Sequence, residues 1–336
     1  MRVMVTGGTG FIGYHSSRAL QRAGHEVCLL VRSVDKVKRL WGNSSPPCVL
    51  GDVSDAASVK RALDGCDAVL HSAAMVSTSA VDAGRVYDTN VGGTRRVVAS
   101  ALDQGVGAIV YVSSVVALFN PHATMLDGDS PLGNASNPYG RSKVACEEFA
   151  RQLQAEGAPI AISYPATVIG PDDPGLTEPH IGLQTFLSRF VPSMPSGAQF
   201  VDVRDVAEVH CRLLERETSG GRFAVGGHYV PWRELGPLLE QLTARRLLKL
   251  PVNGGVMRSL GSLVDGLKRL VPFDLPMGRE AMTYATQWVQ LDSSRVESEL
   301  GFTFRPLEQS LIDTIQWLCR AGHISAAQAG ALAARV

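Results

Sequence analysis

The sequence predicts an α/β protein with one doubly wound parallel sheet and a second, smaller and mostly helical lobe. Short, almost continuously apolar strands alternate with helical patterns over the first half of the chain. Strands that are apolar on both faces are typical of a parallel sheet covered by helices on both sides. A chain of 336 residues that is 45% hydrophobic is long enough to bury one large core or two joined ones.

The order of elements follows from the apolar spacing. The first helical pattern, at 11–23, ends at Gly24, because glycine after the last periodic residue is a common helix stop. A long helical pattern covers 81–102, although Gly92 and Gly93 lower its helix propensity. Another helix is expected at 139–156. The predicted strands are residues 2–6, 26–31, 47–50, 68–71, 108–113 and 160–164.

Beyond Tyr164 the pattern loosens, because prolines between 171 and 195 divide the chain into loops and short pieces. Helical patterns return at 203–214, 232–244 and 307–319. We therefore expect a first domain at 1–165, with 200–228 packing back onto it. The second lobe is expected to comprise 166–199 and 229–336.

Composition argues against several classes of function. The formal net charge is zero, so overall charge does not favour binding to nucleic acid or to an anionic membrane. The six cysteines form no CxxC pair, and the eight histidines show no metal-ligand spacing. Neither a disulfide scaffold nor a metal site is therefore expected, and a reducing, cytoplasmic location is favoured.

The segment at 252–271 is largely apolar, as helices that bind membranes are. It carries Arg258, Asp265, Lys268 and Arg269, and no part of the sequence reaches the about 18 uninterrupted apolar residues of a membrane span. We expect a helix that covers a pocket or an interface. A position on a membrane surface is the alternative.

The first chemical motif is the turn Thr6-Gly7-Gly8-Thr9-Gly10-Phe11-Ile12-Gly13, between the first strand and the first helix. Glycines allow positive φ angles and a close approach of the backbone to a pyrophosphate, and the helix N-terminus offers free N–H groups. This context predicts a dinucleotide site; a tight turn without a ligand is the alternative. The expected contact residues are Gly7, Gly10, Phe11, Ile12 and Gly13.

The end of the second strand indicates which dinucleotide binds. NAD sites usually place Asp or Glu here for the ribose hydroxyls, whereas this chain has Arg32 and then Lys36. Arginine can clamp the 2′-phosphate of NADP with two hydrogen bonds. NADP(H) is therefore favoured over NAD(H), with the nearby Asp35 as a contrary sign and a solvated basic cluster as the alternative.

Two further strand ends are expected to contact the cofactor. Asp52, followed by Val53, can accept a hydrogen bond from the adenine amino group, unless Asp52 or Asp55 caps a helix instead. The small residues Ser72, Ala73 and Ala74 follow the fourth strand, where they leave room for a cofactor at the carboxyl edge of the sheet.

The second chemical motif is Tyr139-Gly140-Arg141-Ser142-Lys143. In a helix, Tyr139 and Lys143 lie on one face, one turn apart. A phenol titrates near pH ~10, and an adjacent ammonium favours the tyrosinate, so we expect a lowered Tyr139 pKa and acid–base catalysis. A surface Tyr–Lys pair is the alternative. Ser113 and Ser114 end the fifth strand, where a hydroxyl can polarise a substrate carbonyl.

Together these motifs resemble the extended short-chain dehydrogenase/reductase superfamily, over nearly the whole chain. The resemblance also includes the segments Asn90 to Thr94, Tyr164 to Pro171 and Phe200 to Ala207. It implies a Rossmann domain in which Tyr139 is the acid/base, Lys143 its electrostatic partner and Ser114 the substrate-orienting serine, with Ser113 as the alternative. It further implies that Asn90 supports Lys143 through water and that Pro165, Ala166, Thr167 and Val168 lie beside the nicotinamide.

Within the superfamily, Arg32, Lys36 and Asp52 look like the dihydroflavonol 4-reductase and 3β-hydroxysteroid dehydrogenase branch. The nucleotide-sugar enzymes usually have Val-Tyr-Gly after the serines, whereas Val115-Val116-Ala117 stands here. Met75, Val76 and Phe119 are candidates for an apolar pocket wall, with a role in the core as the alternative.

The expected function is hydride transfer between NADP(H) and a carbonyl or alcohol of a small lipophilic substrate. Two alternatives remain: a nucleotide-sugar epimerase or dehydratase with tightly bound NAD, and a non-catalytic NADP-binding sensor. The resemblance also implies a homodimer, because helices in this superfamily often pair subunits as four-helix bundles.

Overall fold

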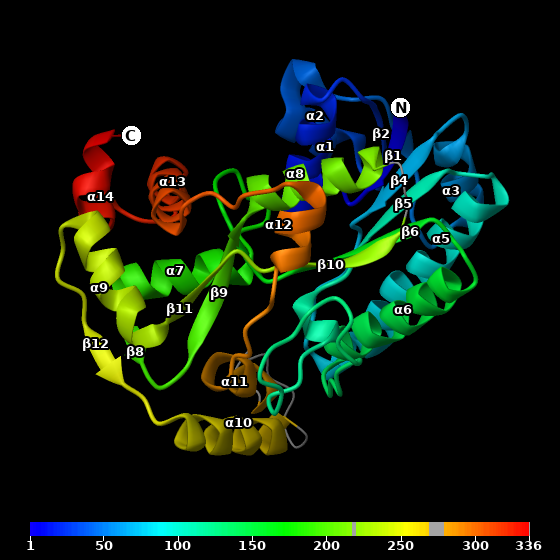
Figure 1. Cartoon of the computed structure of the whole chain (residues 1–336). Coiled ribbons are helices and arrows are strands. Elements are labelled where there is room, and N and C mark those ends of the chain that lie inside the picture. Colours follow the sequence, from blue (N-terminus) through cyan, green and yellow to red (C-terminus); the bar gives the residue numbers. More distant parts are fainter. Residues whose placement is uncertain (217–219, 269–278, 336) are drawn as a thin grey trace.

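The computed structural model describes residues 1–216, 220–268 and 279–335. Its main element is a sheet of seven parallel strands in the order β10-β6-β5-β4-β1-β2-β3 (Figure 1). The predicted doubly wound α/β fold is confirmed. The strands are β1 (Arg2–Thr6), β2 (Glu26–Val31), β3 (Cys48–Leu50), β4 (Ala68–His71), β5 (Ala108–Val112), β6 (Ile160–Pro165) and β10 (Gly221–Val225).

Helices cover both faces of this sheet, as the continuous apolar strands require. Alternate strand residues point to the two faces, so Val3 and Val5 belong to one core and Met4 to the other. One face carries α1 (Phe11–Arg22), α2 (Val34–Trp41) and α8 (Val203–Glu215). The other carries α3 (Ala56–Leu63), α4 (Ala83–Tyr87), α5 (Gly93–Asp103) and α6 (Pro138–Ala155).

The long helix predicted at 81–102 is present as contiguous helical segments, but the type of helix changes along it. After a short 3-10 turn (Ala80–Asp82), α4 passes through a π-helical turn (Asp88–Gly92) into α5. Gly93 is needed by packing, since a Cβ there would lie 2.8 Å from Cγ2 of Val53. The π turn therefore lies where the helix passes close to the loop after β3.

The second lobe, on the left in Figure 1, has its own core. It contains a three-stranded sheet of order β11-β9-β7 and a two-stranded sheet of β12 and β8. Its strands are β7 (Thr167–Ile169), β8 (Val191–Ser193), β9 (Gly197–Asp202), β11 (His228–Pro231) and β12 (Lys249–Pro251). Its helices include α7 (Glu178–Ser188), α9 (Trp232–Thr243), α13 (Leu307–Arg320) and α14 (Ala326–Ala329), followed by a 3-10 helix (Gly330–Arg335). Two of these elements, α7 and β8, lie where the prolines between 171 and 195 had suggested loops and short pieces.

The chain crosses between the two lobes several times. Within 200–228, α8 packs on α1 and β10 pairs with β6. The segment with α12 (Ser294–Leu300) also packs on the first domain, because Val296, Phe302 and Phe304 belong to the core on the α1 face. The expected division had placed this segment in the second lobe.

The segment expected at 252–271 contains α10 (Gly254–Lys268), which packs against α11 (Arg279–Thr286); residues 269–271 lie outside the described ranges. Val256, Leu260 and Leu263 of α10 are exposed. Among the described residues, no helix combines the length and the hydropathy needed to cross a membrane.

Candidate active site

The glycine turn between β1 and α1 has the shape of a cradle for an anion. Gly7 has φ +74°, and a Cβ on Gly13 would lie 2.3 Å from the Gly7 carbonyl oxygen. Within the described chain, no side chain caps α1 at Gly10, and the first turn of α1 carries no acidic residue. Free N–H groups and the positive end of the helix dipole therefore remain for a pyrophosphate, so the residues fit a dinucleotide.

Phe11 and Ile12 begin α1 and face the protein rather than open space. The ring of Phe11 is buried and packs edge-on against His15 and His180, with centroids 5.4 and 5.1 Å away. Ile12 is half-buried against the same core. Their side chains thus hold the helix in place, and any contact with the cofactor from them would come from the backbone.

His180 joins the loop after β7 to the start of α1, a connection that the sequence did not indicate. It is fully buried, and its Nδ1 lies 2.9 Å from Oδ2 of Asp173. Burial alone would raise the pKa of Asp173, but hydrogen bonds from His180 and from backbone N–H groups outweigh it and lower this pKa to about 2. The loop is therefore fixed beside the nucleotide turn.

Arg32 lies at the carboxyl end of β2 with a strongly exposed side chain. Its Nε is 3.9 Å from Oδ2 of Asp52, so an acidic group stands close to the expected phosphate clamp. Asp55, and not Asp52, caps α3, because its side chain accepts hydrogen bonds from two backbone N–H groups of that helix. The Asp52 side chain accepts from the Ser54 N–H at 2.8 Å. Lys36 is half-buried in the first turn of α2.

The end of β4 lies beside β1, where the strand order reverses direction. Ser72 donates to the Thr6 carbonyl at 2.8 Å, and the Ala73 N–H donates to the Thr6 hydroxyl at 3.2 Å. Ala74 is exposed. This is the switch point at which doubly wound sheets bind ligands. Val53 is buried below it and serves the core.

The start of α6 brings Tyr139 to the same edge of the sheet. The Asn137 side chain caps the helix by accepting from the Gly140 N–H at 2.8 Å, and Pro138 occupies the first turn. Lys143, one turn later, is buried with its Nζ 5.9 Å from the Tyr139 ring centroid. The Nζ donates to the Val112 carbonyl at 3.0 Å, which fixes the ammonium at the end of β5.

The expected lowering of the Tyr139 pKa is wrong for this structure. Burial raises the pKa of Tyr139 to about 12, and the negative charge of Glu178 acts in the same direction. A side-chain hydrogen bond from Ser114 opposes the rise without cancelling it. The ammonium of Lys143 lies against the Val112 carbonyl instead of the phenol oxygen, and burial lowers the pKa of Lys143 itself.

The two serines after β5 differ in their surroundings. Ser114 is half-buried, hydrogen-bonds Tyr139, and accepts from the Val116 N–H at 3.3 Å. Ser113 is buried, and in the described chain its hydroxyl has no hydrogen-bond partner. Of the two, Ser114 is the one that the structure brings together with Tyr139.

Asn90 lies in the π turn and is buried. Its side chain accepts from the Met75 N–H at 2.7 Å and donates to the Met75 carbonyl at 3.0 Å and to Ser142 Oγ at 2.8 Å. It therefore ties the segment after β4 to the residue beside Lys143. π turns are often found at functional sites.

The remaining predicted residues lie around this edge. Pro165 ends β6, and the Ala166 N–H bonds to the Val225 carbonyl at 3.1 Å. Thr167 is half-buried and Val168 is buried in β7. Val76 is 63% exposed, so it forms no closed wall. Phe119 is buried against Tyr284, with ring centroids 4.2 Å apart.

Helix α11 supplies contacts that the sequence did not predict. The carboxylate of Glu280 accepts from the Asn137 N–H at 2.7 Å, from the Ser136 N–H at 3.0 Å and from the Ser136 hydroxyl. Tyr284 donates to Glu280 at 3.3 Å, and burial together with the charges of Glu280 and Tyr139 raises the pKa of Tyr284. The helix start that carries Tyr139 is thus held from the second half of the chain.

One group of potential metal ligands comes together among the described residues: His25, Cys211 and Glu215, with their ligand atoms within 4.8 Å of one another. A hydrogen bond of 2.8 Å between His25 and Glu215 accounts for this contact. Burial, followed by the charge of Glu215, raises the pKa of Cys211 to about 12.

A model of the NAD dependent epimerase/dehydratase family matches residues 3–226. The chain belongs to this family. The resemblance to extended short-chain dehydrogenases/reductases is thereby confirmed, and the protein is a nicotinamide-dependent enzyme of the oxidoreductase type.

Similar proteins extend the match to nearly the full chain. A provisionally named dihydroflavonol 4-reductase of Synechocystis sp. is 30% identical over 95% of each chain. Sterol demethylase protein B of Methylococcus capsulatus is 29% identical over 96% of this chain and 100% of its own. The crystal structure of gox2253 is 27% identical, covers 96% of this chain and 99% of its own, and has a TM-score of 0.81.

Proposed function

We propose that this family member is an NADP(H)-dependent oxidoreductase that acts on a carbonyl or alcohol of a lipophilic substrate. The observation that carries the proposal is the hydrogen bond between Ser114 and Tyr139 at the carboxyl edge of the sheet, with Lys143 one helical turn away. Two hydroxyl groups at one point can together hold one carbonyl oxygen. A protein that only binds a dinucleotide has no use for this arrangement.

The residues take separate roles in the reductive direction. NADPH, when bound, supplies the hydride. Because the pKa of Tyr139 is about 12, its phenol is protonated at neutral pH and is ready to give a proton to the substrate oxygen. Ser114 donates a hydrogen bond to the same oxygen, and the ammonium of Lys143 stabilises the tyrosinate that remains.

The preference for NADP(H) rests on Arg32. Its exposed guanidinium lies at the end of β2, where the adenosine ribose of a bound dinucleotide is expected. Asp52, whose Oδ2 lies 3.9 Å from the Arg32 Nε, brings negative charge near the expected position of the 2′-phosphate. We infer that the arginine determines the preference, since it is free to turn toward solvent.

A reductase is favoured over a nucleotide-sugar epimerase by the aromatic pair Phe119–Tyr284, which Glu280 connects to the start of the helix that carries Tyr139. The two relatives named above also have names that indicate lipophilic or aromatic substrates, a flavonoid and a sterol. An epimerase regenerates its own NAD and would retain it. The purified protein is therefore expected to carry no tightly bound NAD and to oxidise added NADPH.

The test is Tyr139→Phe, measured by NADPH oxidation with a panel of aldehydes, ketones and sterol ketones. We expect turnover to fall by at least about a hundredfold, in line with general acid–base catalysis, while NADPH binding changes little. Tyr87→Phe, on an exposed tyrosine of α4, is the matched control. Unchanged turnover in the Tyr139 variant would refute the assignment, and NADPH binding without turnover of any compound in the wild type would favour a sensor.

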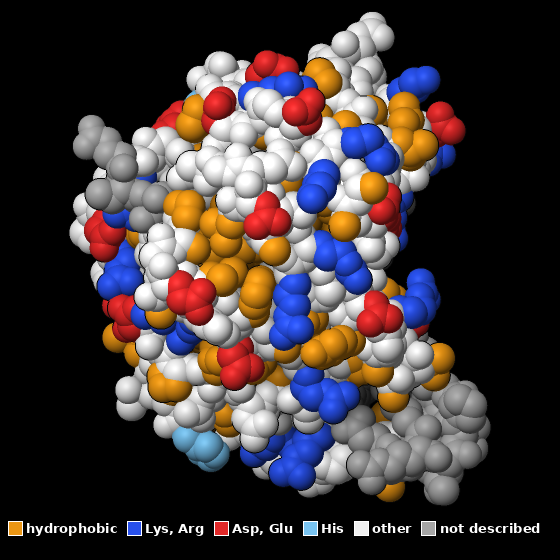
Figure 2. Space-filling view, turned by 90° about the vertical axis from the view of Figure 1, so that its right-hand side faces the viewer, with side chains coloured by type: hydrophobic (Ala, Val, Ile, Leu, Met, Phe, Trp, Pro, Cys, Tyr) orange, Lys and Arg blue, Asp and Glu red, His pale blue; other side chains and the backbone are white. Residues whose placement is uncertain are grey.

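We also infer a homodimer and a reducing compartment such as the cytoplasm. Figure 2 shows the side that carries α5 and α6, with apolar side chains gathered near its middle. Phe149 of α6 is half-buried there, with the Arg95 guanidinium 5.6 Å from its ring centroid. All six cysteines, which lie within the described ranges, are free, which fits a reducing environment.

A further inference from the structure

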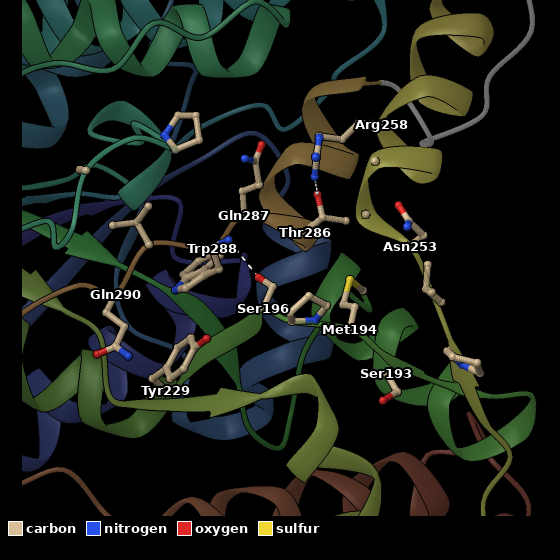
Figure 3. Close-up of a pocket in the computed structure, with 18 of the residues that line it drawn as sticks. Ser193, Met194, Ser196, Tyr229, Asn253, Arg258, Thr286, Gln287, Trp288 and Gln290 are labelled. Atoms are coloured by element: carbon tan, nitrogen blue, oxygen red, sulfur yellow. Dashed lines mark hydrogen bonds between the residues drawn. The ribbon is translucent and has the colours of Figure 1, made fainter.

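A cavity of about 1010 Å³ lies between the second lobe and the helices α10 and α11 (Figure 3). Its wall combines large side chains, Trp288, Tyr229 and Met194, with uncharged polar groups such as Asn253 and Gln287. Figure 3 shows Trp288 and Tyr229 on one side and Arg258 and Asn253 on the other. A space of this size accepts a ligand with several fused or linked rings.

The cavity is connected to the reaction centre by two segments of the chain. Pro121 in the lining follows shortly after Phe119, and Thr286 in the lining is two residues beyond Tyr284. The rings of Phe119 and Tyr284 contact each other at a tilt, with centroids 4.2 Å apart, and Tyr284 donates to Glu280, which holds the start of the helix that carries Tyr139. The aromatic pair therefore links two segments of the cavity lining to the start of α6.

Arg258 is the one charged side chain among the described residues of the cavity lining. Its Nη1 donates to Thr286 Oγ1 at 2.8 Å, and no carboxylate of the described chain forms an ion pair with it. A guanidinium has five N–H donors in a planar fork, so several remain for a ligand. This fork matches a carboxylate, sulfonate or phosphate oxygen pair better than any neutral group.

The position of Arg258 is built into the packing of α10 on α11. A Cβ on Gly254 would lie 2.9 Å from Thr286 Cβ and 3.1 Å from Arg258 Nη1, so glycine is needed for this approach. Thr286 is itself buried and donates to the Met282 carbonyl at 2.6 Å. The guanidinium is thus held by a fixed acceptor rather than lying loose in solvent.

We propose that the cavity binds the distal part of the substrate and that Arg258 pairs with a single anionic group there. The substrate class is then a carbonyl compound with a bulky ring-containing body, which packs on Trp288 and Tyr229, and one acid group, such as a polycyclic or aromatic keto acid. A nucleoside diphosphate carries at least two negative charges, and one arginine cannot neutralise both. The assignment of a carbonyl substrate rests on the proposed reductase function. The binding of an anionic ligand by Arg258 in the cavity does not depend on that function.

The binding test uses two fluorescent probes with the same rings: anilinonaphthalene sulfonate, which carries one acid group, and the uncharged phenylnaphthylamine. Without NADPH, we expect Arg258→Gln to weaken the sulfonate by about tenfold or more, because it loses a charge-assisted pair. Binding of phenylnaphthylamine should change by less than about twofold. Arg258→Lys should restore part of the sulfonate affinity, and Arg233→Gln, on an exposed arginine outside the cavity lining, should change neither probe.

Ala123→Trp places a large side chain in the lining and is expected to weaken both probes. Equal losses of both probes in Arg258→Gln, no loss of the sulfonate, or sulfonate binding unaffected by Ala123→Trp would each overturn the site. A second measurement separates the site from the reaction: NADPH oxidation with a polycyclic keto acid and with its neutral methyl ester. Arg258→Gln should lower kcat/KM for the acid alone. A binding effect without any turnover would instead count against the reductase function and leave the anion site supported.

Discussion

In the proposed reaction, the raised pKa of Tyr139 should make reduction and oxidation respond differently to pH. Reduction needs the protonated phenol as an acid, and oxidation needs the tyrosinate as a base. With a pKa of about 12, the phenol keeps its proton throughout the neutral range. We therefore expect the reductive rate to be flat between about pH 6 and 9, and the oxidative rate to rise with pH over the same interval.

The magnitude follows from the fraction of tyrosinate. At pH 8, a pKa of about 12 leaves roughly one phenol in ten thousand ionised, against roughly one in a hundred for an ordinary tyrosine with pKa 10. The oxidative rate should accordingly increase about tenfold for each pH unit, without a plateau before the protein unfolds. The pKa of Tyr139 is raised rather than lowered because burial destabilises the charged form of the phenol.

The assay measures NADP⁺-dependent oxidation of an alcohol and NADPH-dependent reduction of the corresponding ketone in the same buffers. A deuterated alcohol shows, by its isotope effect, whether hydride transfer limits the oxidative rate. Tyr139→Phe serves as the control, because its residual rate should show no such slope. An oxidative rate that levels off below about pH 9 would refute the raised pKa of Tyr139 in the working enzyme, because Lys143 or the bound cofactor would then outweigh burial.

Two further variants test contacts at the edges of the site. Arg32→Ala should weaken the binding of NADPH by about tenfold or more and that of NADH by less than about twofold, because only NADPH has the 2′-phosphate. Lys38→Ala, at an exposed position of α2, is the control. Equal losses of affinity for both cofactors would show that Arg32 does not touch the phosphate. Glu280→Ala removes the acceptor of the Ser136 and Asn137 N–H groups, so unfolding in urea should become easier by about 1–3 kcal/mol and kcat should fall. Glu308→Ala, on an exposed glutamate, should do neither; normal kcat in the Glu280 variant would mean that the start of α6 needs no clamp from α11.

The features that the sequence predicts well are those carried by neighbouring residues. The strand, glycine turn and helix at the N-terminus follow each other directly, and a turn that needs Gly7 and Gly13 has few alternatives. The spacing of Tyr139 and Lys143 places them on one helix face by geometry alone. The pattern also locates Ser114 at the end of a strand, and the structure then distinguishes it from Ser113.

The features that the sequence misses depend on long-range contacts and on burial. Spacing alone suggests that Lys143 lowers the Tyr139 pKa, but the ammonium finds an acceptor in the Val112 carbonyl and the phenol is desolvated. Nothing near Glu280 in the sequence indicates that it holds the start of α6, since the partners are more than a hundred residues apart. Likewise, Phe302 packs on the first domain because strand and helix positions far upstream leave that face to be covered.

The division between local motifs and long-range contacts separates the residues proposed for the chemistry from those proposed to determine substrate specificity. The groups that we propose for the chemistry, Ser114, Tyr139 and Lys143, lie within one short stretch of the first domain, and members of a large family can share them. The groups that surround the proposed substrate, such as Tyr284, Trp288 and Arg258, come from the second half of the chain. A family match over residues 3–226 therefore covers the reaction centre but ends before most of the cavity lining. Specificity should accordingly change with substitutions at 251–258 and 284–290 while the hydride-transfer chemistry persists.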